Sequence, residues 1–360
     1  MTRPGFAALR VLADRPATEA LRRLVETLRA GGYANQVLQG GDRELRAASQ
    51  LALGHPVPLG DLGRHDVDAL VATGAADVDA ARLAPRFTLF ALGNVVVLVP
   101  TDGGDDPGRV YFGRDSLWLA DYASRRARQG GAMADLGTGA GTVAALLAPH
   151  YDTVVGTDIV DRTAACAALT FALNPRADGS PAATACLTDV SGGLASGAFM
   201  LVTGNPPWMP ALDREVHGPQ RVFAEGGTTG FELPRRFILE GASLLRPDGD
   251  MVMLAVDVTW ANGDRPLHAL ARGLRRLGYE VAMVSTGVDE PWRDTEIDLA
   301  VRFPGIESAE HVALVVHRPL ELGNVLGSEW LAEVGEGEAE EGPEEPMGGQ
   351  FGGHALRAGD

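Results

Sequence analysis

Hydrophobic positions in the first seventy residues recur at the spacing of helices. Apolar side chains three or four residues apart share one face of residues 18–31, 42–53 and 65–73. We expect Thr18 to cap the first of these segments, and a pair of glycines ends it. The pattern predicts three short amphipathic helices.

The pattern then changes to that of extended strands. Two apolar runs, residues 87–90 and 95–99, are separated by a turn that contains Gly93 and Asn94, which predicts a β-hairpin. Three helices and a hairpin are typical of a winged-helix-like α+β module, which we assign to residues 1–105. Because this stretch has no dense cluster of Lys and Arg, we expect the module to contact substrate or to form a dimer rather than to read DNA.

The middle of the chain contains four short apolar runs that predict buried strands. In order, they lead into a glycine loop at Gly137, into Asp158, into Asp189 and into Asn205. Each feature alone is common. Their succession at four strand ends is a much more specific signal.

The first of these loops is rich in glycine. Gly137, Gly139 and Gly141 follow Asp135 and precede apolar residues at helical spacing. Glycine permits a tight turn and lets a ligand approach the backbone, so a strand, a glycine loop and a helix start indicate a nucleotide-like ligand. Thr142 stands where a dinucleotide fingerprint has its final glycine, and the Lys-Ser/Thr ending of a P-loop is missing.

Two acids follow at the next strand ends. Asp158 lies 17 positions beyond Gly141, where a carboxylate can accept hydrogen bonds from both ribose hydroxyls of a nucleoside. Asp189 ends the third predicted strand, where a carboxylate can meet an adenine amino group. Taken singly, an acid in such a place is more often a helix cap or a loop residue.

Asn205-Pro206-Pro207-Trp208 is the most informative stretch of the chain. The two prolines fix φ and remove two backbone donors, and the first pushes Asn205 toward an extended conformation. The corner therefore presents acceptors, including Asn205 Oδ1 and the Pro206 carbonyl, beside the face of Trp208. It suits a planar NH2 group, although a proline-rich turn with a buried tryptophan is the simpler interpretation of the tetrapeptide alone.

This succession resembles the class I S-adenosylmethionine-dependent methyltransferases over roughly residues 110–290. Within them it resembles the Asn-Pro-Pro-aromatic branch, which methylates nitrogen on amides, adenines and guanines. It is most similar to the release-factor glutamine methyltransferases, in which a glycine-rich segment like residues 226–232 follows the corner and a turn like that in residues 244–254 enters the fifth strand. Trp208 replaces the tyrosine usual in glutamine methylation, and Asp248 stands where that turn commonly has glycine.

The resemblance implies an α/β fold, with a Rossmann-like seven-stranded methyltransferase sheet over residues 106–320 behind the N-terminal module. It implies S-adenosyl-L-methionine as cofactor and no metal. The implied cofactor-binding residues are Asp135, Gly137, Gly139, Gly141, Asp158, Asp189 and Asn205, and the implied catalytic residues are Asn205, Pro206 and Trp208.

Residues 109–120 occupy the place where such enzymes border the cofactor's methionine end and the substrate. Asp115 or Ser116 is expected to cap a helix over residues 117–128. Arg114 is a candidate partner for an acidic substrate group or for the cofactor carboxylate. Near the C-terminal end, a helix over 267–277 and strands over 279–284, 299–303 and 311–316 are expected to complete the sheet.

Charge and composition limit the partners. The chain has 31 basic and 48 acidic residues, a net charge of −17, and nucleic-acid binding depends strongly on Lys and Arg. Part of the acidic excess lies in residues 321–360, whose Gly, Pro and Glu content predicts a disordered tail.

Two cysteines make neither a disulfide framework nor a metal site. No signal peptide or membrane span is indicated, so we expect a cytoplasmic protein, and the Ala, Gly and Arg content suggests a bacterial source.

We therefore expect an N-methyltransferase acting on a planar amide or amine nitrogen of a protein glutamine or a small metabolite, as a monomer or homodimer. N-methylation of an rRNA or DNA base is the alternative, disfavoured by the charge. A non-enzymatic adenosylmethionine-binding regulator is a third reading, against which the intact Asn205-Pro206-Pro207-Trp208 corner argues. His217 is a weak candidate for taking the released proton, because a lone loop histidine is usually only solvated.

Overall fold

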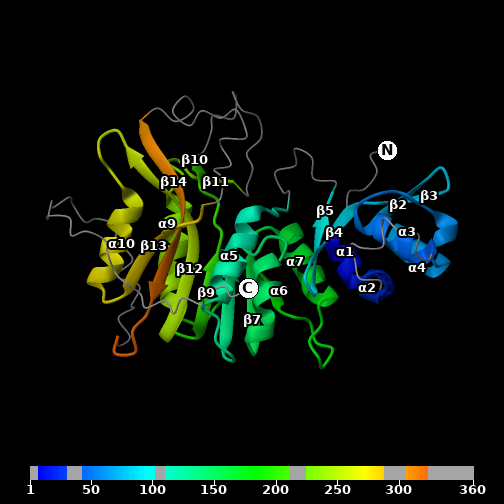
Figure 1. Cartoon of the computed structure of the whole chain (residues 1–360), viewed down its shortest axis with the longest axis horizontal. Helices are drawn as coiled ribbons and strands as arrows, with labels where there is room; N and C mark the ends of the chain where they lie inside the picture. Colours follow the sequence, from blue (N-terminus) through cyan, green and yellow to red (C-terminus); the bar gives the residue numbers. More distant parts are fainter. Residues whose placement is uncertain (1–6, 31–42, 102–109, 211–223, 288–304, 323–360) are drawn as a thin grey trace, which may run out of the picture.

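The computed structural model describes residues 7–30, 43–101, 110–210, 224–287 and 305–322. An N-terminal module of helices and short strands lies at one end of the long axis, and a large sheet with its helices makes up the rest (Figure 1). The sheet consists of β6 (Ala132–Leu136), β7 (Thr153–Asp158), β8 (Thr184–Leu187), β9 (Phe199–Gly204), β12 (Leu245–Trp260), β13 (Glu280–Ser285) and β14 (Ile306–His317).

The strand order is β13-β14-β12-β9-β6-β7-β8. Every neighbouring pair from β12 to β8 is parallel, whereas β14 is antiparallel to both of its neighbours. The predicted Rossmann-like, seven-stranded methyltransferase sheet is therefore confirmed. The parallel strands β6, β7, β8 and β9 are those that the apolar runs predicted.

Helices cover both faces of the sheet. One face carries α5 (Arg114–Ser124), α6 (Thr142–Leu147), the 3₁₀ turn η2 (Ala148–His150) and α7 (Asp161–Leu173), and the other carries α9 (Glu232–Leu244) and α10 (Pro266–Arg276). Met133 and Leu201 pack with the first set, and Ala134 and Val202 pack with the second. Adjacent strand residues point to opposite faces, so continuous apolar strands are buried on both sides.

The N-terminal module contains the predicted helices and one that the pattern did not reveal. Its elements are α1 (Ala8–Ala13), α2 (Arg15–Ala30), α3 (Arg43–Ala52), β1 (Val57–Pro58), the 3₁₀ turn η1 (Leu59–Asp61), α4 (Arg64–Ala72), β2 (Ala76–Asp79), β3 (Arg82–Pro85), β4 (Phe87–Leu92) and β5 (Val95–Pro100). The predicted cap is wrong, because α2 begins at Arg15 and Asp14 Oδ1 accepts from the amide of Ala17 at 3.0 Å. Thr18 is instead buried inside the helix, where its hydroxyl donates to the Val11 carbonyl at 2.9 Å.

The predicted hairpin is confirmed as β4–β5, but it lies outside the small sheet of the module. The short strands β1, β3 and β2 form a separate antiparallel sheet in that order, and β5 packs on α7 of the large domain. The first hundred residues thus form a small α+β module in which the hairpin serves as the bridge to the methyltransferase sheet.

Asn174, at the end of α7, joins this helix to β5 of the hairpin by hydrogen bonds. Its buried amide accepts from Val96 N–H at 2.8 Å and donates to the Val96 carbonyl at 2.7 Å. Arg22 and Arg29 of α2 donate to the carbonyls of Ala172 and Leu173. The apolar core of the module continues without a break into α7, where it includes the buried Cys166, Leu169 and Leu173.

Several predicted boundaries shift. The helix expected over residues 117–128 begins at Arg114 and ends at Ser124, and β8 ends at Leu187, before Asp189. Asp248 has φ +64°, in the left-handed region that favours glycine, and its carboxylate pairs with Arg128. The predicted strand over 299–303 and residues 323–360 of the tail lie outside the described residues.

Candidate active site

The parallel strands bring the predicted features to one edge of the sheet. Leu136 of β6 pairs with Thr157 of β7 and with Gly204 of β9. The glycine loop, Asp158 and Asn205 follow directly on these three residues. Because parallel strands end on the same side of the sheet, segments separated by tens of residues in the chain form one site.

The glycine loop turns sharply between β6 and α6. Gly137, Gly139 and Gly141 have φ values of +63°, +57° and +79°, which side chains with a Cβ rarely adopt. A Cβ on Gly141 would lie 2.8 Å from the ring of Phe171. The loop therefore requires glycine both for its backbone and for its packing.

Asp135 stabilises the glycine loop by hydrogen bonding. Its side chain is 2% exposed, and its two oxygens accept from the hydroxyls of Thr138 at 2.7 Å and Thr203 at 2.8 Å. Burial raises the pKa of Asp135 to about 6, against the opposing effect of these hydrogen bonds. The carboxylate thus ties the loop to β9, a role for which Thr138 and Thr203 gave no recognisable sequence signal.

Asp158 lies at the end of β7, beside the loop. Its carboxylate accepts from the amides of Gly139 at 3.2 Å and Val160 at 3.0 Å, and burial raises its pKa to about 6. Next to it, the large apolar side chains of Ile159 and Leu187 are 59% and 61% exposed. A carboxylate has about four acceptor positions, so Asp158 retains capacity for ribose hydroxyls beside an apolar surface suited to an adenine ring.

Asp189 is placed differently from the other acid. It lies beyond the end of β8, and both of its oxygens accept from Arg236 of α9 at 2.9 Å. Arg236 also bonds Glu240. The structure therefore gives Asp189 a cation partner within the protein, and does not bring it into the hydrogen-bond network of Asp158.

Asn205 is oriented by residues that precede the sheet. Its Nδ2 donates to Asp115 Oδ2 at 2.8 Å, and Asp115 also accepts from the Tyr111 hydroxyl at 2.9 Å and from Ser116 N–H at 2.7 Å. The expected capping role of Asp115 or Ser116 is wrong, because Gly113 is the N-cap residue of α5 and no side chain caps it. An ionised carboxylate only accepts hydrogen bonds, so Asp115 fixes which end of the Asn205 amide it meets.

The glycine-rich segment over residues 226–232 lies against the backbone of Pro207 and Trp208. β10 (Met209–Pro210) and β11 (Glu225–Gly227) form a two-stranded parallel sheet. A Cβ on Gly226 would lie 2.7 Å from the Pro207 carbonyl oxygen and 2.8 Å from Trp208 Cα. The close approach of the two backbones explains why glycine occurs in this segment.

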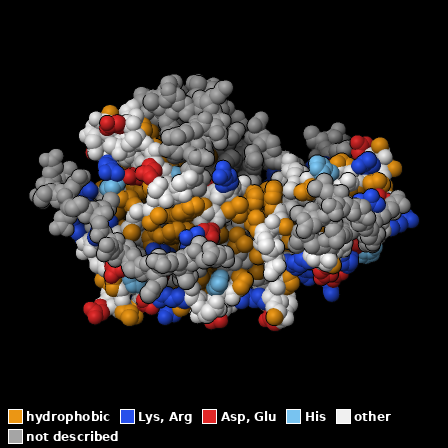
Figure 2. Space-filling view, in the orientation of Figure 1, with side chains coloured by type: hydrophobic (Ala, Val, Ile, Leu, Met, Phe, Trp, Pro, Cys, Tyr) orange, Lys and Arg blue, Asp and Glu red, His pale blue; other side chains and the backbone are white. Residues whose placement is uncertain are grey.

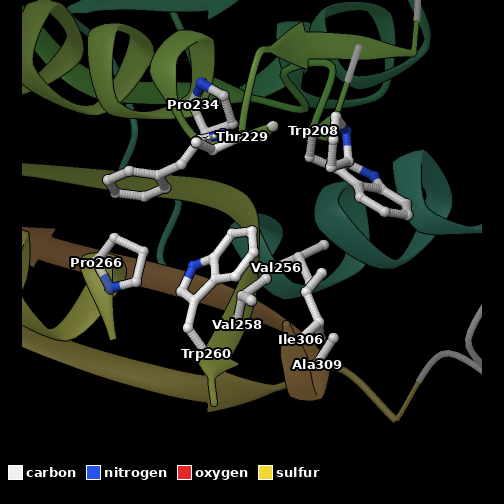
Figure 3. A pocket seen from close by; sticks show the side chains of 12 residues that line it. Trp208, Thr229, Pro234, Val256, Val258, Trp260, Pro266, Ile306 and Ala309 are labelled. Carbon is white, nitrogen blue, oxygen red and sulfur yellow. Dashed lines mark hydrogen bonds between the residues drawn. The ribbon is translucent and has the colours of Figure 1, made fainter. Parts of the chain in front are cut away.

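An apolar pocket that is open to solvent begins at Trp208. Its walls are formed by the corner, by the segment that leads into the start of α9, by the C-terminal end of β12 and by the N-terminal end of β14 (Figure 3). Val256, Val258 and Trp260 supply one wall, and Phe231 and Pro234 supply another. Sequence reasoning missed this pocket, because nothing in the pattern showed that β12 continues past the sheet.

These residues fit S-adenosylmethionine. The loop glycines present a backbone surface that side chains would obstruct, Asp158 has acceptors for hydroxyls, and Ile159 and Leu187 offer an apolar surface. Arg114 is exposed at the start of α5, close in sequence to Asp115. His217, considered from sequence, lies outside the described residues.

The described surface shows no segregation of charge on the face seen in Figure 2, where basic and acidic side chains are interspersed around a central hydrophobic area. Within the described ranges, no group of three or more His, Cys, Asp or Glu side chains could hold a metal ion. No helix in the same ranges is long and apolar enough to cross a membrane.

Residues 117–261 match the family model of the methyltransferase small domain. The chain is also similar in part to solved structures. A ribosomal protein L11 methylase from Lactobacillus delbrueckii subsp. bulgaricus is 18% identical, with 59% of this chain and 83% of that chain covered and a TM-score of 0.37. An rRNA methylase from Streptococcus thermophilus is 11% identical, with 58% and 99% covered and a TM-score of 0.35.

No curated protein sequence matches the chain significantly. The family match spans the strands and loops that carry the glycine loop, Asp158 and Asn205. The match therefore lies on the part of the chain that forms the site, and it supports S-adenosylmethionine-dependent methyl transfer as the activity of the protein.

Proposed function

We propose that the protein methylates a planar amide or amine nitrogen, carried by a protein glutamine or by a small metabolite. The observation that carries the proposal is the hydrogen bond from Asn205 Nδ2 to Asp115. This bond uses the donor end of the Asn205 amide. Asn205 Oδ1 is therefore the end that can accept a hydrogen bond from the NH2 group of the methyl acceptor.

The roles of the corner follow from this orientation. Asn205 Oδ1 and the Pro206 carbonyl accept the two hydrogens of the NH2 group. This arrangement turns the nitrogen lone pair away from the acceptors and stabilises positive charge as it develops on nitrogen. Trp208 holds the planar group by stacking, with a cation–π contribution in the transition state. When bound, S-adenosylmethionine supplies an activated methyl group, so the protein mainly has to align the reactants.

The cofactor-binding assignments follow the same geometry. Gly137, Gly139 and Gly141 form the loop around the cofactor, Asp158 binds the ribose, and Asp135 acts through the loop. Asp189 is held by its ion pair with Arg236, so we assign it the smallest contribution to affinity. We also propose the division into residues 1–105, 106–320 and a tail over 321–360.

Asn205→Ala tests the proposal. We expect methyl transfer to fall by at least ~100-fold, because the acceptor nitrogen is no longer oriented. The affinity for S-adenosylhomocysteine, measured by calorimetry, should stay within about threefold, a change below ~0.7 kcal/mol. Asn262→Ala is the matched control, since Asn262 only bonds Asp264 in a surface turn. Near-normal turnover in Asn205→Ala would contradict the mechanism.

The same assay with labelled cofactor and fractionated cell extract identifies the acceptor class. We expect Asn205-dependent label in protein or in small metabolites. Label in RNA or DNA would instead establish the alternative, a base N-methyltransferase.

A further inference from the structure

We propose that the methyl acceptor is a small molecule whose planar nitrogen is attached to an uncharged aromatic body, and that this body occupies the pocket between Trp208 and Trp260. The inference rests on the proposed N-methylation and adds the acceptor's chemical class to it.

The pocket is built by a part of β12 that extends beyond the shared sheet. Pairing of β12 with β9 ends at Met253 and Gly204, whereas pairing with β14 continues to Trp260 and Ile306. The final part of β12 therefore projects past the edge where the site lies. Side chains alternate along a strand, which places Val256, Val258 and Trp260 toward the pocket.

The lining is apolar and rigid. Two indoles, the ring of Phe231 and three prolines surround the space, and Thr229 supplies the only polar side chain among the described lining residues. Aromatic walls bind another ring by apolar burial and by stacking.

The nearest charged groups on β12 are turned away and paired. Asp257 alternates to the other side of the strand, where it bonds Arg265 at 2.8 Å and His268 at 2.9 Å. A phosphate or carboxylate in the pocket would lose hydration without meeting a cation among the described lining residues. The lining that the described residues form therefore favours an uncharged ring over a nucleotide.

Matched ring probes test this proposal by calorimetry with S-adenosylhomocysteine present. Naphthamide and naphthoate have the same ring and nearly the same shape, but only naphthoate is charged. We expect naphthamide to bind at least about tenfold more tightly than naphthoate, a difference of ~1.4 kcal/mol. Trp260→Ala should weaken naphthamide about tenfold, a loss of ~1.4 kcal/mol, and should leave S-adenosylhomocysteine affinity unchanged. The control Leu320→Ala removes an apolar side chain that is 72% exposed and lies outside the pocket, and should change neither affinity.

A charge introduced into the wall gives a second, opposite test. Val258→Arg should strengthen naphthoate and weaken naphthamide, because the new guanidinium supplies the missing cation. The proposal is overturned if naphthamide does not bind, if naphthoate or adenosine monophosphate binds wild type equally well, or if Trp260→Ala leaves naphthamide binding unchanged.

Failure of this proposal is distinguishable from failure of the proposed function. Asn205-dependent label in RNA or in a glutamine peptide, without naphthamide binding, would reject the aromatic acceptor and keep N-methylation. Trp260-dependent naphthamide binding, without Asn205-dependent label in any fraction, would keep the pocket and reject N-methylation.

Discussion

At the scale of single residues, Asp115 decides how Asn205 is presented. An asparagine side chain has a donor end and an acceptor end of nearly the same shape, so its orientation comes from its partners. Asp115 accepts from Asn205 and is itself held by Tyr111 and by Ser116 N–H. Asp115 is therefore a positioning residue, which acts on the reaction through Asn205.

Asp115→Ala should lower kcat by roughly 100-fold, because a misplaced reactive group costs about that much. Tyr111→Phe should have a smaller effect of a few-fold, since Asp115 keeps its bond to Ser116 N–H. Measuring KM for the methyl acceptor and the affinity for S-adenosylhomocysteine distinguishes a positioning role from general damage to the fold. A positioning role leaves both values nearly unchanged. If Asp115→Ala raises only KM and keeps kcat, then the carboxylate contributes to binding and not to orientation.

Asp158 predicts a pH dependence of cofactor binding. Burial raises its pKa to about 6 in the folded protein, so the carboxylate is ionised above that pH and becomes protonated as the pH falls through it. Protonation removes acceptor capacity for the ribose hydroxyls, and the affinity for S-adenosylhomocysteine should decline between about pH 7.5 and pH 5.

Asp158→Asn separates this effect from that of Asp135, whose pKa is also raised to about 6. The variant should bind the cofactor more weakly at pH 7.5 and should lose most of the pH dependence. Calorimetry across the pH range checks both expectations. An unchanged pH profile in Asp158→Asn would assign the titration to another group.

At the scale of elements, the site depends on two backbones that approach closely. The glycine-rich segment over residues 226–232 lies against the corner, and β11 pairs with β10 directly after Trp208. Glu232 closes the segment by accepting from Thr229 N–H at 3.1 Å. The glycines thus serve Trp208 and the pocket, and not the cofactor loop.

Gly226→Ala should displace the corner and the glycine-rich segment, because the added methyl group meets the carbonyl oxygens of Gly230 and Pro207, the latter at 2.7 Å. We expect acceptor turnover to fall at least tenfold, a cost of ~1.4 kcal/mol or more, with little change in S-adenosylhomocysteine affinity. Gly60→Ala is a suitable control, since a Cβ there meets nothing within 4 Å. Equal turnover in the two variants would show that the corner tolerates the displacement.

At the scale of the whole molecule, the N-terminal module is joined to the methyltransferase domain by a continuous core. That core includes Ala140 of the glycine loop as well as residues of α7, a helix that begins three positions after Asp158. The module therefore packs against the cofactor side of the site. It lies at the opposite end of the molecule from the part of β12 and β14 that forms the pocket wall (Figure 1).

Asn174→Ala should weaken this junction. The change leaves the buried N–H and carbonyl of Val96 without their partners, which costs about 2–4 kcal/mol for the two groups together. Urea unfolding should show a lower midpoint, whereas Asn262→Ala at the surface should leave it nearly unchanged. An unaltered midpoint in Asn174→Ala would mean that the apolar contacts alone hold the module.

The sequence by itself determined the parallel strands β6, β7, β8 and β9 and the order of features at their ends. Buried parallel strands are written as continuous apolar runs, and tight loops require glycine, so Gly137, Asp158 and Asn205 were placed from local patterns. The resemblance of that order to the class I methyltransferases implied a Rossmann-like sheet and S-adenosylmethionine. Local patterns also located α2, α3, α4 and the β4–β5 hairpin.

Only the tertiary structure decided which side chains meet. Asp115 and Asn205 are 90 positions apart in the chain, Asp189 pairs with Arg236 across 47 positions, and Val258 and Trp260 join Trp208 at a pocket formed by an extended β12. A carboxylate, an amide or an indole carries no local signal of its partner, because hydrogen bonding and apolar burial act through space. The sequence therefore indicated the chemistry of methyl transfer, and the packing of distant segments decided the orientation of Asn205 and the shape offered to the acceptor.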